Sequence, residues 1–272
     1  MFGNKILCPS LTKILSLSVL LLLTNNILAK DEADDQVHQN TKQTQLNFVT
    51  FIDPPYIFDP NETDSKGLVE IIFESLMQRT NIKYDIQIMP AKRAEIFAQT
   101  NQNTCVFPIE KSQEREVFFS WVSPIIVSKQ GFFSDPNHPI FLQVLEDAWP
   151  YRIGSYLGSG MGEYLESFGY QVDLATQNEA NILKLKMNRI DLWSSDILTA
   201  EHFSKISGIE ISASKLDFFT TLRAIGCHLS VAQNTVSRMQ QELQEMYKSG
   251  QIYNIVQKFK ADTFSIENLD WP

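Results

Sequence analysis

The hydrophobic and polar positions from residue 46 onward follow two alternating patterns. LNFVTFI, at 46–52, is mostly apolar, which is typical of a strand, and it ends at the prolines of DPPY. In LVEIIFESLMQRT, at 68–80, Leu68, Ile72 and Leu76 recur at helical spacing, which predicts a helix with one buried face. The alternation continues with the strand YDIQIM, the helix AKRAEIFAQT and the short buried strand TCVFPI. This order predicts a parallel sheet with helices on its faces.

A second unit of the same kind follows. Its expected elements are the strands YRIGSYL, YQVDLA and IDLWSS and the helices GEYLESFG and NEANILKLKMN, the latter capped by Asn178. After FFTTLRAIGCHL, an amphipathic helical region at 235–259, interrupted at Gly250, closes the pattern. The expected fold class is therefore α/β, with two units of similar size. Ligands bind at the carboxyl ends of strands in such sheets, so two facing units predict a cleft.

The first 45 residues lack this pattern. Lys5 and Lys13 precede a short apolar run, and Ala29 follows at the expected exit, so residues 1–29 predict a cleaved secretory signal peptide. A membrane anchor is less favoured, because a membrane span needs about 20 apolar residues. Residues 30–45 are almost entirely polar and predict a disordered leader. The expected localisation is the periplasm.

Charge and composition narrow the function. The formal net charge of −9 argues against a nucleic-acid-binding protein, which needs a basic face. The four histidines are scattered without the spacing of a zinc site: His38, His138, His202 and His228. No Ser/His/Asp or Cys/His arrangement stands out along the chain. We therefore expect no metal, no cofactor and no catalytic residues.

Several segments together resemble the bacterial extracellular solute-binding proteins of family 3, which include the polar amino-acid receptors of ABC transporters. The matching segments are, in order, PPY at 54–56, GLVEIIFESL, PAKRAEIF, KSQEREVFFSWVSP, IGSYLGSGMGEYL, NRIDLWSSD and YKSGQIYNIVQKF. The resemblance implies a two-lobed periplasmic binding protein type II fold with a ligand cleft between the lobes. Lobe one would comprise 46–127 and 216–268, and lobe two 128–215. Pro124 would end its segment and lead into the crossover between them.

The resemblance also implies ligand-binding residues. Arg115, in SQEREVFFSWVSP, matches the family's arginine that holds a ligand carboxylate, a task suited to the paired donors of a guanidinium. The alternative is a surface ion pair with Glu114 or Glu116. Ser159 and Gly160, in YLGSGMGE, would form an anion cradle at a helix N-terminus. The alternative there is an ordinary glycine-rich turn.

Further candidates come from the same segments. Asp196 ends DLWSSD at the position where the family's aspartate takes the ligand's α-amino group, and the alternative is a helix cap. Arg93, in PAKRAEIF, is another candidate ligand-binding residue. Tyr56, Phe107 and Trp193 are the candidate pocket walls, although each residue type is more often found in a core.

Some positions depart from the family's pattern. Where amino-acid receptors usually have serines before the arginine, this chain has Phe107, Pro108 and Glu110. It has Ala91 and Asp53 where aromatic residues are frequent. Compared with these amino-acid receptors, the chain thus has fewer hydroxyl donors and more acidic side chains at these positions. These departures indicate a ligand other than a standard polar amino acid.

The cysteines are interpreted in the light of export. Cys105 and Cys227 would enter an oxidising compartment, where two cysteines are a candidate pair, and two separately buried thiols are the alternative. In the family's topology, the strand that holds Cys227 returns to lobe one beside the strand that holds Cys105. The resemblance therefore implies a disulfide between them. Cys8 would leave with the signal peptide.

The resemblance implies a monomeric protein that captures a small anionic or zwitterionic, amino-acid-like solute by hinge closure for ABC-type uptake. Its partner would be a permease complex in the inner membrane. The first alternative is a stand-alone sensing or scavenging protein that serves a signalling partner. A dehydratase-like enzyme on the same fold is the less favoured alternative.

Overall fold

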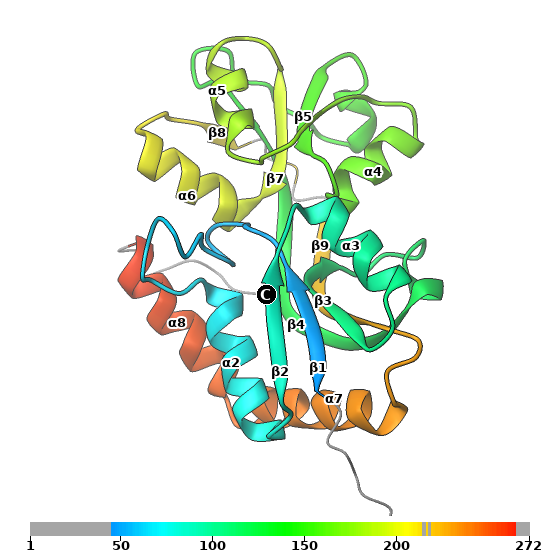
Figure 1. Cartoon of the computed structure of the whole chain (residues 1–272). Coiled ribbons are helices and arrows are strands. Elements are labelled where there is room, and N and C mark those ends of the chain that lie inside the picture. Colours follow the sequence, from blue (N-terminus) through cyan, green and yellow to red (C-terminus); the bar gives the residue numbers. More distant parts are fainter. Residues whose placement is uncertain (1–44, 214–215, 217–218, 265–272) are drawn as a thin grey trace, which may run out of the picture. The chain divides into compact units, whose positions relative to one another are not determined.

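The computed structural model describes residues 45–213, 216 and 219–264. The expected signal peptide, and the expected leader apart from Gln45, lie outside the described residues. A mixed sheet of nine strands runs through the described chain. Its order is β2–β1–β3–β9–β4–β7–β5–β6, and β8 pairs with β4 beside this path (Figure 1).

Lobe one is built on parallel strands separated by the predicted helices. The elements are β1 (Leu46–Thr50), α2 (Leu68–Thr80), β2 (Tyr84–Ile88), α3 (Ala91–Thr100) and β3 (Thr104–Glu110). β1 pairs with β2 on one side and β3 on the other. Successive residues of a strand face opposite sides of the sheet. Phe48 therefore packs in the core that includes α2, while Val49 packs with Ala94 and Ala98 of α3.

Two strands cross between the lobes. β4 (Phe119–Ser134), which follows the 3₁₀ turn η1 (Glu116–Phe118), pairs antiparallel with β9 (Phe219–His228). β9 also pairs with β3, and the end of β4 pairs with β7, so these strands connect the sheets of both lobes. The prediction that Pro124 ends its segment is wrong. β4 continues through it with a register shift, because a proline at a bulge interrupts the ladder without ending the strand.

Lobe two repeats the strand–helix alternation. Its elements are η2 (Leu145–Ala148), β5 (Arg152–Tyr156), α4 (Gly160–Ser167), β6 (Gln171–Ala175), α5 (Ala180–Lys186), β7 (Leu192–Asp196), α6 (Ile197–Ser207) and β8 (Ser212–Ala213). β5 pairs in parallel with β6 and β7. The expected cap at Asn178 is wrong, since Glu179 is the N-cap of α5. Asn178 instead accepts a hydrogen bond from the buried indole of Trp193 at 3.2 Å, which gives that N–H a partner.

The last two helices are α7 (Gln233–Lys248) and α8 (Gln251–Phe264). Gly250 separates them with a φ of +74°, a conformation that glycine adopts without steric cost. The buried face of α7, including Met239 and Leu243, packs in the same core as α2 (Figure 1). In the described part of the chain, no helix combines the length and the hydrophobicity that a membrane crossing requires.

Candidate ligand-binding cleft

Charged side chains gather where the end of β3, α3 and the loop after β1 face the N-termini of α4 and α6. Six of the buried charged residues belong to this group, which we call the cleft cluster: Asp53, Glu95, Glu110, Arg115, Asp196 and Arg223. Four are carboxyls and two are guanidiniums. Burial of a charge is costly unless it is paired or hydrogen-bonded, so the contacts of this cluster determine what the cleft can bind.

Arg115 lies just before η1 and is only 3% exposed. Its Nε and Nη2 donate to the two carboxylate oxygens of Glu95, both at 3.2 Å, in a paired geometry. Nη2 also donates to Glu163 of α4 at 2.8 Å. The backbone carbonyls of Glu110 and Gly158 accept at 3.2 Å each. The ion-pair partners of Arg115 are therefore distant in the sequence, and one of them belongs to lobe two.

Glu110 ends β3, and its carboxylate lies at the N-terminus of α4. Its Oε2 accepts a hydrogen bond from the backbone N–H of Met161 at 3.1 Å. A helix N-terminus attracts a carboxylate because its N–H groups lack helical partners and the helix dipole is positive there. Gly160 makes this approach possible, since a Cβ at that position would lie 2.4 Å from Oε2 of Glu110.

Ser159 is the N-cap of α4, and its Oγ accepts from the backbone N–H of Gly162 at 3.1 Å. The predicted anion cradle at Ser159 and Gly160 is therefore a helix N-terminus. In this structure the carboxylate that it holds is the side chain of Glu110. The sequence analysis noted Glu110 as a departure from the family and did not assign it a role.

Asp196 is the N-cap of α6, which is the alternative role that the sequence analysis considered for it. Its Oδ1 accepts from the backbone N–H groups of Leu198 at 3.0 Å and Thr199 at 3.4 Å. The same oxygen accepts from the hydroxyl of Tyr56 at 2.5 Å, which brings together side chains 140 positions apart and joins the two lobes. Oδ2 of Asp196 is buried and has no hydrogen-bond partner among the described residues.

Arg223 of β9 is a member of the cluster that the sequence analysis did not single out. Its Nη1 donates to Asp53 at 2.6 Å, and both side chains are 2% exposed. Its guanidinium lies 4.1 Å from the ring centroid of Tyr56. Glu110 is its neighbour in the register of β3 and β9. The available signal was a lone charge within the otherwise uncharged strand pattern TTLRAIGC.

The remaining candidates lie outside this cluster. Phe107 is a core residue that stacks on Phe73 with ring centroids 4.0 Å apart. Trp193 is also in a core, where it packs near Phe203. Arg93 is exposed on α3 and does not line either cleft cavity described next. The structure therefore groups Tyr56, Arg115, Ser159, Gly160 and Asp196 and separates the other three.

Two cavities lie along the cleft. The first, beside Glu95, Glu110 and Arg223, has a volume of about 10 Å³, which is room for about one water molecule. The second, which we call the mouth cavity, measures about 480 Å³ and is bounded by both lobes. Most of its walls are apolar: Phe51, Ile52, Pro54, Ile88, Met89, Pro90, Ala91, Leu157 and Phe203. Its volume falls within the range of about 300–1,000 Å³ that small-molecule pockets occupy.

The electrostatics of the cleft are dominated by its acids. Burial raises the pKa of Glu110 and of Asp53 above their ordinary values of 4.5 and 3.8, although the nearby arginines oppose this shift. Burial alone lowers the pKa of Arg223, but Asp53 and other neighbours raise it well above its ordinary value overall. Among the described residues, no group of three or more His, Cys, Asp or Glu side chains is placed to hold a metal ion.

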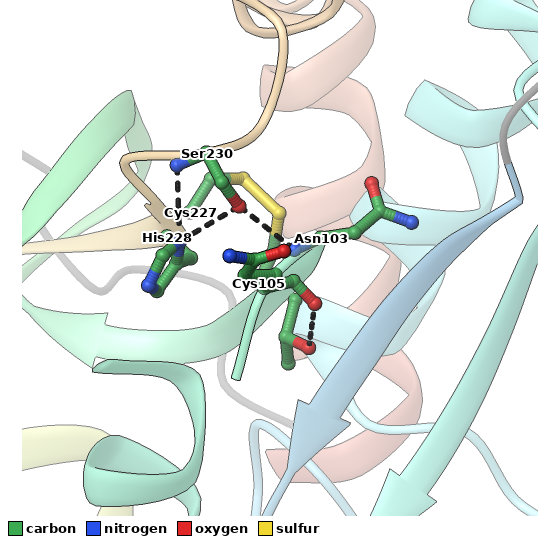
Figure 2. The surroundings of a disulfide bond; sticks show 7 residues. Asn103, Cys105, Cys227, His228 and Ser230 are labelled. Carbon is green, nitrogen blue, oxygen red and sulfur yellow. Dashed lines mark hydrogen bonds between the residues drawn. A yellow bond between two sulfur atoms is a disulfide. The ribbon is translucent and has the colours of Figure 1, made fainter. Parts of the chain in front are cut away.

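A disulfide joins β3 and β9 at the far end of lobe one from this cluster. Cys105 and Cys227 lie opposite each other in the antiparallel register, and both are fully buried. Figure 2 shows the bond beside a small hydrogen-bonded group, in which the backbone N–H of Asn103 donates to Ser230 Oγ at 3.0 Å. The bond closes a sequence separation of 122 residues, which includes all of lobe two.

No protein-family model and no curated protein matches the sequence. Solved structures match it in fold. One is a histidine kinase sensor domain with similarity to periplasmic binding proteins (TM-score 0.71, 16% identity, 79% of this chain and 95% of that chain). Another is a mutant of ArgBP from T. maritima (TM-score 0.70, 18% identity, 82% and 96%). A third is the substrate-binding protein of an amino acid ABC transporter (TM-score 0.69, 16% identity, 82% and 100%). The chain therefore has the two-lobed α/β fold of periplasmic binding proteins.

Proposed function

We propose that the protein captures a small solute between its two lobes and delivers it to an ABC-type importer. The observation that carries this proposal is the set of polar contacts that cross the cleft. Tyr56 donates to Asp196, Met161 donates to Glu110, and Arg115 pairs with Glu163. Side chains of both lobes thus converge where a solute would touch both, so solute binding is coupled to lobe closure.

The cellular setting belongs to the same proposal. Residues 1–29 would direct export to the periplasm, where the monomeric protein meets its solute and then a permease complex. The fold neighbours named above include binding proteins, and we propose binding without catalysis for this chain. No nucleic-acid partner is proposed, in keeping with the net charge of −9.

A second candidate function is sensing. Its support is the likeness of this chain to a histidine kinase sensor domain. A protein of this kind would present its closed form to a signalling partner instead of an importer. Permease and ATPase genes beside the gene for this chain would favour uptake, and a sensor kinase gene would favour signalling.

The proposal is tested on the chain from residue 30 to residue 272, purified without denaturation. Mass spectrometry of the purified protein identifies small molecules that accompany it. Small-angle scattering is then recorded with and without each identified compound at saturation. We expect a smaller radius of gyration with the bound solute, because closure brings the lobes together. Unchanged curves for every compound that binds would contradict capture by hinge closure.

A further inference from the structure

The first step concerns where a ligand carboxylate could bind in this cleft. Three groups suit a carboxylate: the guanidiniums of Arg115 and Arg223 and the N-terminus of α4. Each already holds a carboxylate of the chain itself. Arg223 donates to Asp53 at 2.6 Å through Nη1, and its buried Nε has no hydrogen-bond partner among the described residues. Glu95 accepts two hydrogen bonds from Arg115, and Glu110 accepts one from Met161 at the start of α4.

The fit of Glu110 at α4 is close. A Cβ at Gly160 would meet Oε2 of Glu110 at 2.4 Å and Nη1 of Arg115 at 2.7 Å, so any larger residue there would force these two side chains to shift. The adjoining cavity of about 10 Å³ holds no second carboxylate. A solute carboxylate at α4 or at Arg115 would have to displace Glu110 or Glu95 and would place its own negative charge beside theirs.

The second step concerns charge. The cleft cluster contains four carboxyls and two guanidiniums, all buried. Lys92 and Glu163, which pair with each other at 2.6 Å at the edge of the cluster, leave this imbalance unchanged. Asp196 keeps one buried oxygen without a hydrogen-bond partner among the described residues.

The third step concerns the mouth cavity, which adjoins the cluster. Its walls are mostly apolar, and Asp53 of the cluster is part of its lining. The other charged residues in the lining are Lys92 and Glu179, and Lys92 is already bound to Glu95 and Glu163. The cavity thus offers about 480 Å³ of mainly apolar space next to acids whose charge is incompletely balanced. An apolar body with one positive end complements both features.

We propose that the solute is an amine with an apolar body and no carboxylate, and that Glu110 is the residue that excludes the carboxylate. The apolar body lies in the mouth cavity, and the ammonium faces the acids of the cleft cluster. This inference rests on the proposed capture of a solute between the lobes. It replaces the anionic or zwitterionic solute that the resemblance implied.

Matched pairs of compounds test the proposal, because each amine below is its amino acid without the carboxylate. The pairs are phenethylamine and phenylalanine, tyramine and tyrosine, tryptamine and tryptophan, and isoamylamine and leucine. Isothermal titration calorimetry on the wild-type chain 30–272 measures both members of each pair. We expect at least one amine to bind about 100-fold more tightly than its amino acid, since juxtaposed like charges cost several kcal/mol. An amino acid that binds as tightly as its amine, in every pair that binds, overturns the proposal.

The variant Glu110→Ala identifies the excluding group. It vacates the N-terminus of α4, so we expect the amino acid of the same pair to gain affinity and the preference for the amine to shrink at least tenfold. Glu62→Ala is the control, because it removes the same charge from an exposed position and should keep the preference. If Glu110→Ala fails to fold by circular dichroism, Glu110→Gln tests the charge alone, because glutamine removes the negative charge but still occupies the N-terminus of α4. An unchanged preference in the folded variant overturns the role of Glu110.

The outcomes separate this inference from the proposed function. Tight binding of amino acids with compaction in small-angle scattering upholds solute capture and overturns only the amine preference. If neither the amines, nor the amino acids, nor any co-purified compound binds, both the proposed function and this inference are wrong.

Discussion

At the scale of single residues, the paired carboxylates around Arg115 are the most consequential feature. Arg115 is 3% exposed, and Glu95 beside it is also buried. Loss of one partner of a buried pair leaves the other charge without compensation, which costs about 3–5 kcal/mol. Arg115 is therefore expected to stabilise the fold, whatever contact it makes with a solute.

The corresponding prediction compares two substitutions. Arg115→Ala should lower the free energy of unfolding by about 3–5 kcal/mol, and Arg115→Lys by less, because lysine keeps the charge but loses the paired donors. Urea unfolding measures both. Arg79→Ala is the control, since Arg79 pairs with Glu242 on the surface, where such pairs contribute about 0–1 kcal/mol. Equal effects of Arg115→Ala and Arg79→Ala would contradict the buried-pair interpretation.

A second residue-scale prediction concerns the pH dependence of stability. Burial raises the pKa of Glu110 in the folded protein above 4.5, so the folded state holds this proton more tightly than the unfolded state. The stabilising contribution of the protonated group is complete below 4.5 and is lost as the pH rises through the folded-state pKa. Relative to Glu110→Gln, the wild type should therefore become less stable as the pH rises from 4.5.

The measurement is urea unfolding of wild type and Glu110→Gln at a series of pH values on both sides of 4.5. Glutamine keeps an oxygen that can accept from Met161 and does not titrate, and all other titrating groups are common to both proteins. Parallel stability curves across the series would show that the pKa of Glu110 is not raised in the folded state.

At the scale of elements, the sheet is held together by strands that return from the second lobe. β9 pairs with β3 and β4, and the disulfide between Cys105 and Cys227 fixes β9 against β3. Because both cysteines lie in lobe one, the bond secures the base of the crossover and leaves lobe two free to move on β4 and β9. A loop of about 100 residues closed by a disulfide loses roughly 4.7 kcal/mol of unfolded-state entropy.

We therefore predict that the chain 30–272, purified under oxidising conditions, has no free thiol after denaturation without reductant. Titration of thiols with a chromogenic disulfide reagent is the measurement. The double variant Cys105→Ala with Cys227→Ala should unfold at a lower urea concentration, by an amount of the order of 4 kcal/mol in free energy. Two free thiols per chain would mean that the cysteines are neighbours in the core without a bond.

At the scale of the whole molecule, the lobes are joined by β4 and β9, and the contacts across the cleft are mainly polar. Buried apolar residues form clusters within lobe one and within lobe two, although Leu198 of α6 packs into the larger lobe-one cluster. Across the cleft, Tyr56 bonds to Asp196, and Glu163 binds both Arg115 and Lys92. A net contribution of about 0.5–1.5 kcal/mol from each hydrogen bond makes closure readily reversible.

The double variant Tyr56→Phe with Glu163→Gln should therefore populate open forms. It removes one hydroxyl donor and one shared carboxylate, and every 1.4 kcal/mol changes a population ratio about tenfold. We expect a larger radius of gyration than in wild type by small-angle scattering without added solute. Arg79→Ala, which alters a contact within lobe one, should leave the radius unchanged. Identical scattering from the double variant and the wild type would show that these contacts do not hold the lobes together.

The sequence by itself determined the architecture and most of the elements, but neither the course of β4 through Pro124 nor the cap of α5. The helices at 68–80 and 91–100 begin and end at the predicted residues, because helical periodicity is a local property of the chain. The strand–helix alternation and the order of the resembling segments predicted the two-lobed α/β fold. Gly250 separates the last helices for the same local reason, since its φ of +74° suits glycine.

Only the tertiary structure decided which charges meet in the cleft. Arg223 and Asp53 are 170 positions apart, and Tyr56 and Asp196 are 140 apart, so no local pattern could pair them. Glu114 and Glu116 flank Arg115 in the sequence, yet in the fold Arg115 forms its ion pairs with Glu95 and Glu163. In the sequence, Glu110 was noted only because it occupies a position where amino-acid receptors usually have a serine. Its contact with the N-terminus of α4 exists because α4 lies opposite the end of β3. Local spacing fixes helices and strands, whereas the pairing of distant charges depends on how the packed elements place them and on the high cost of burying a charge alone.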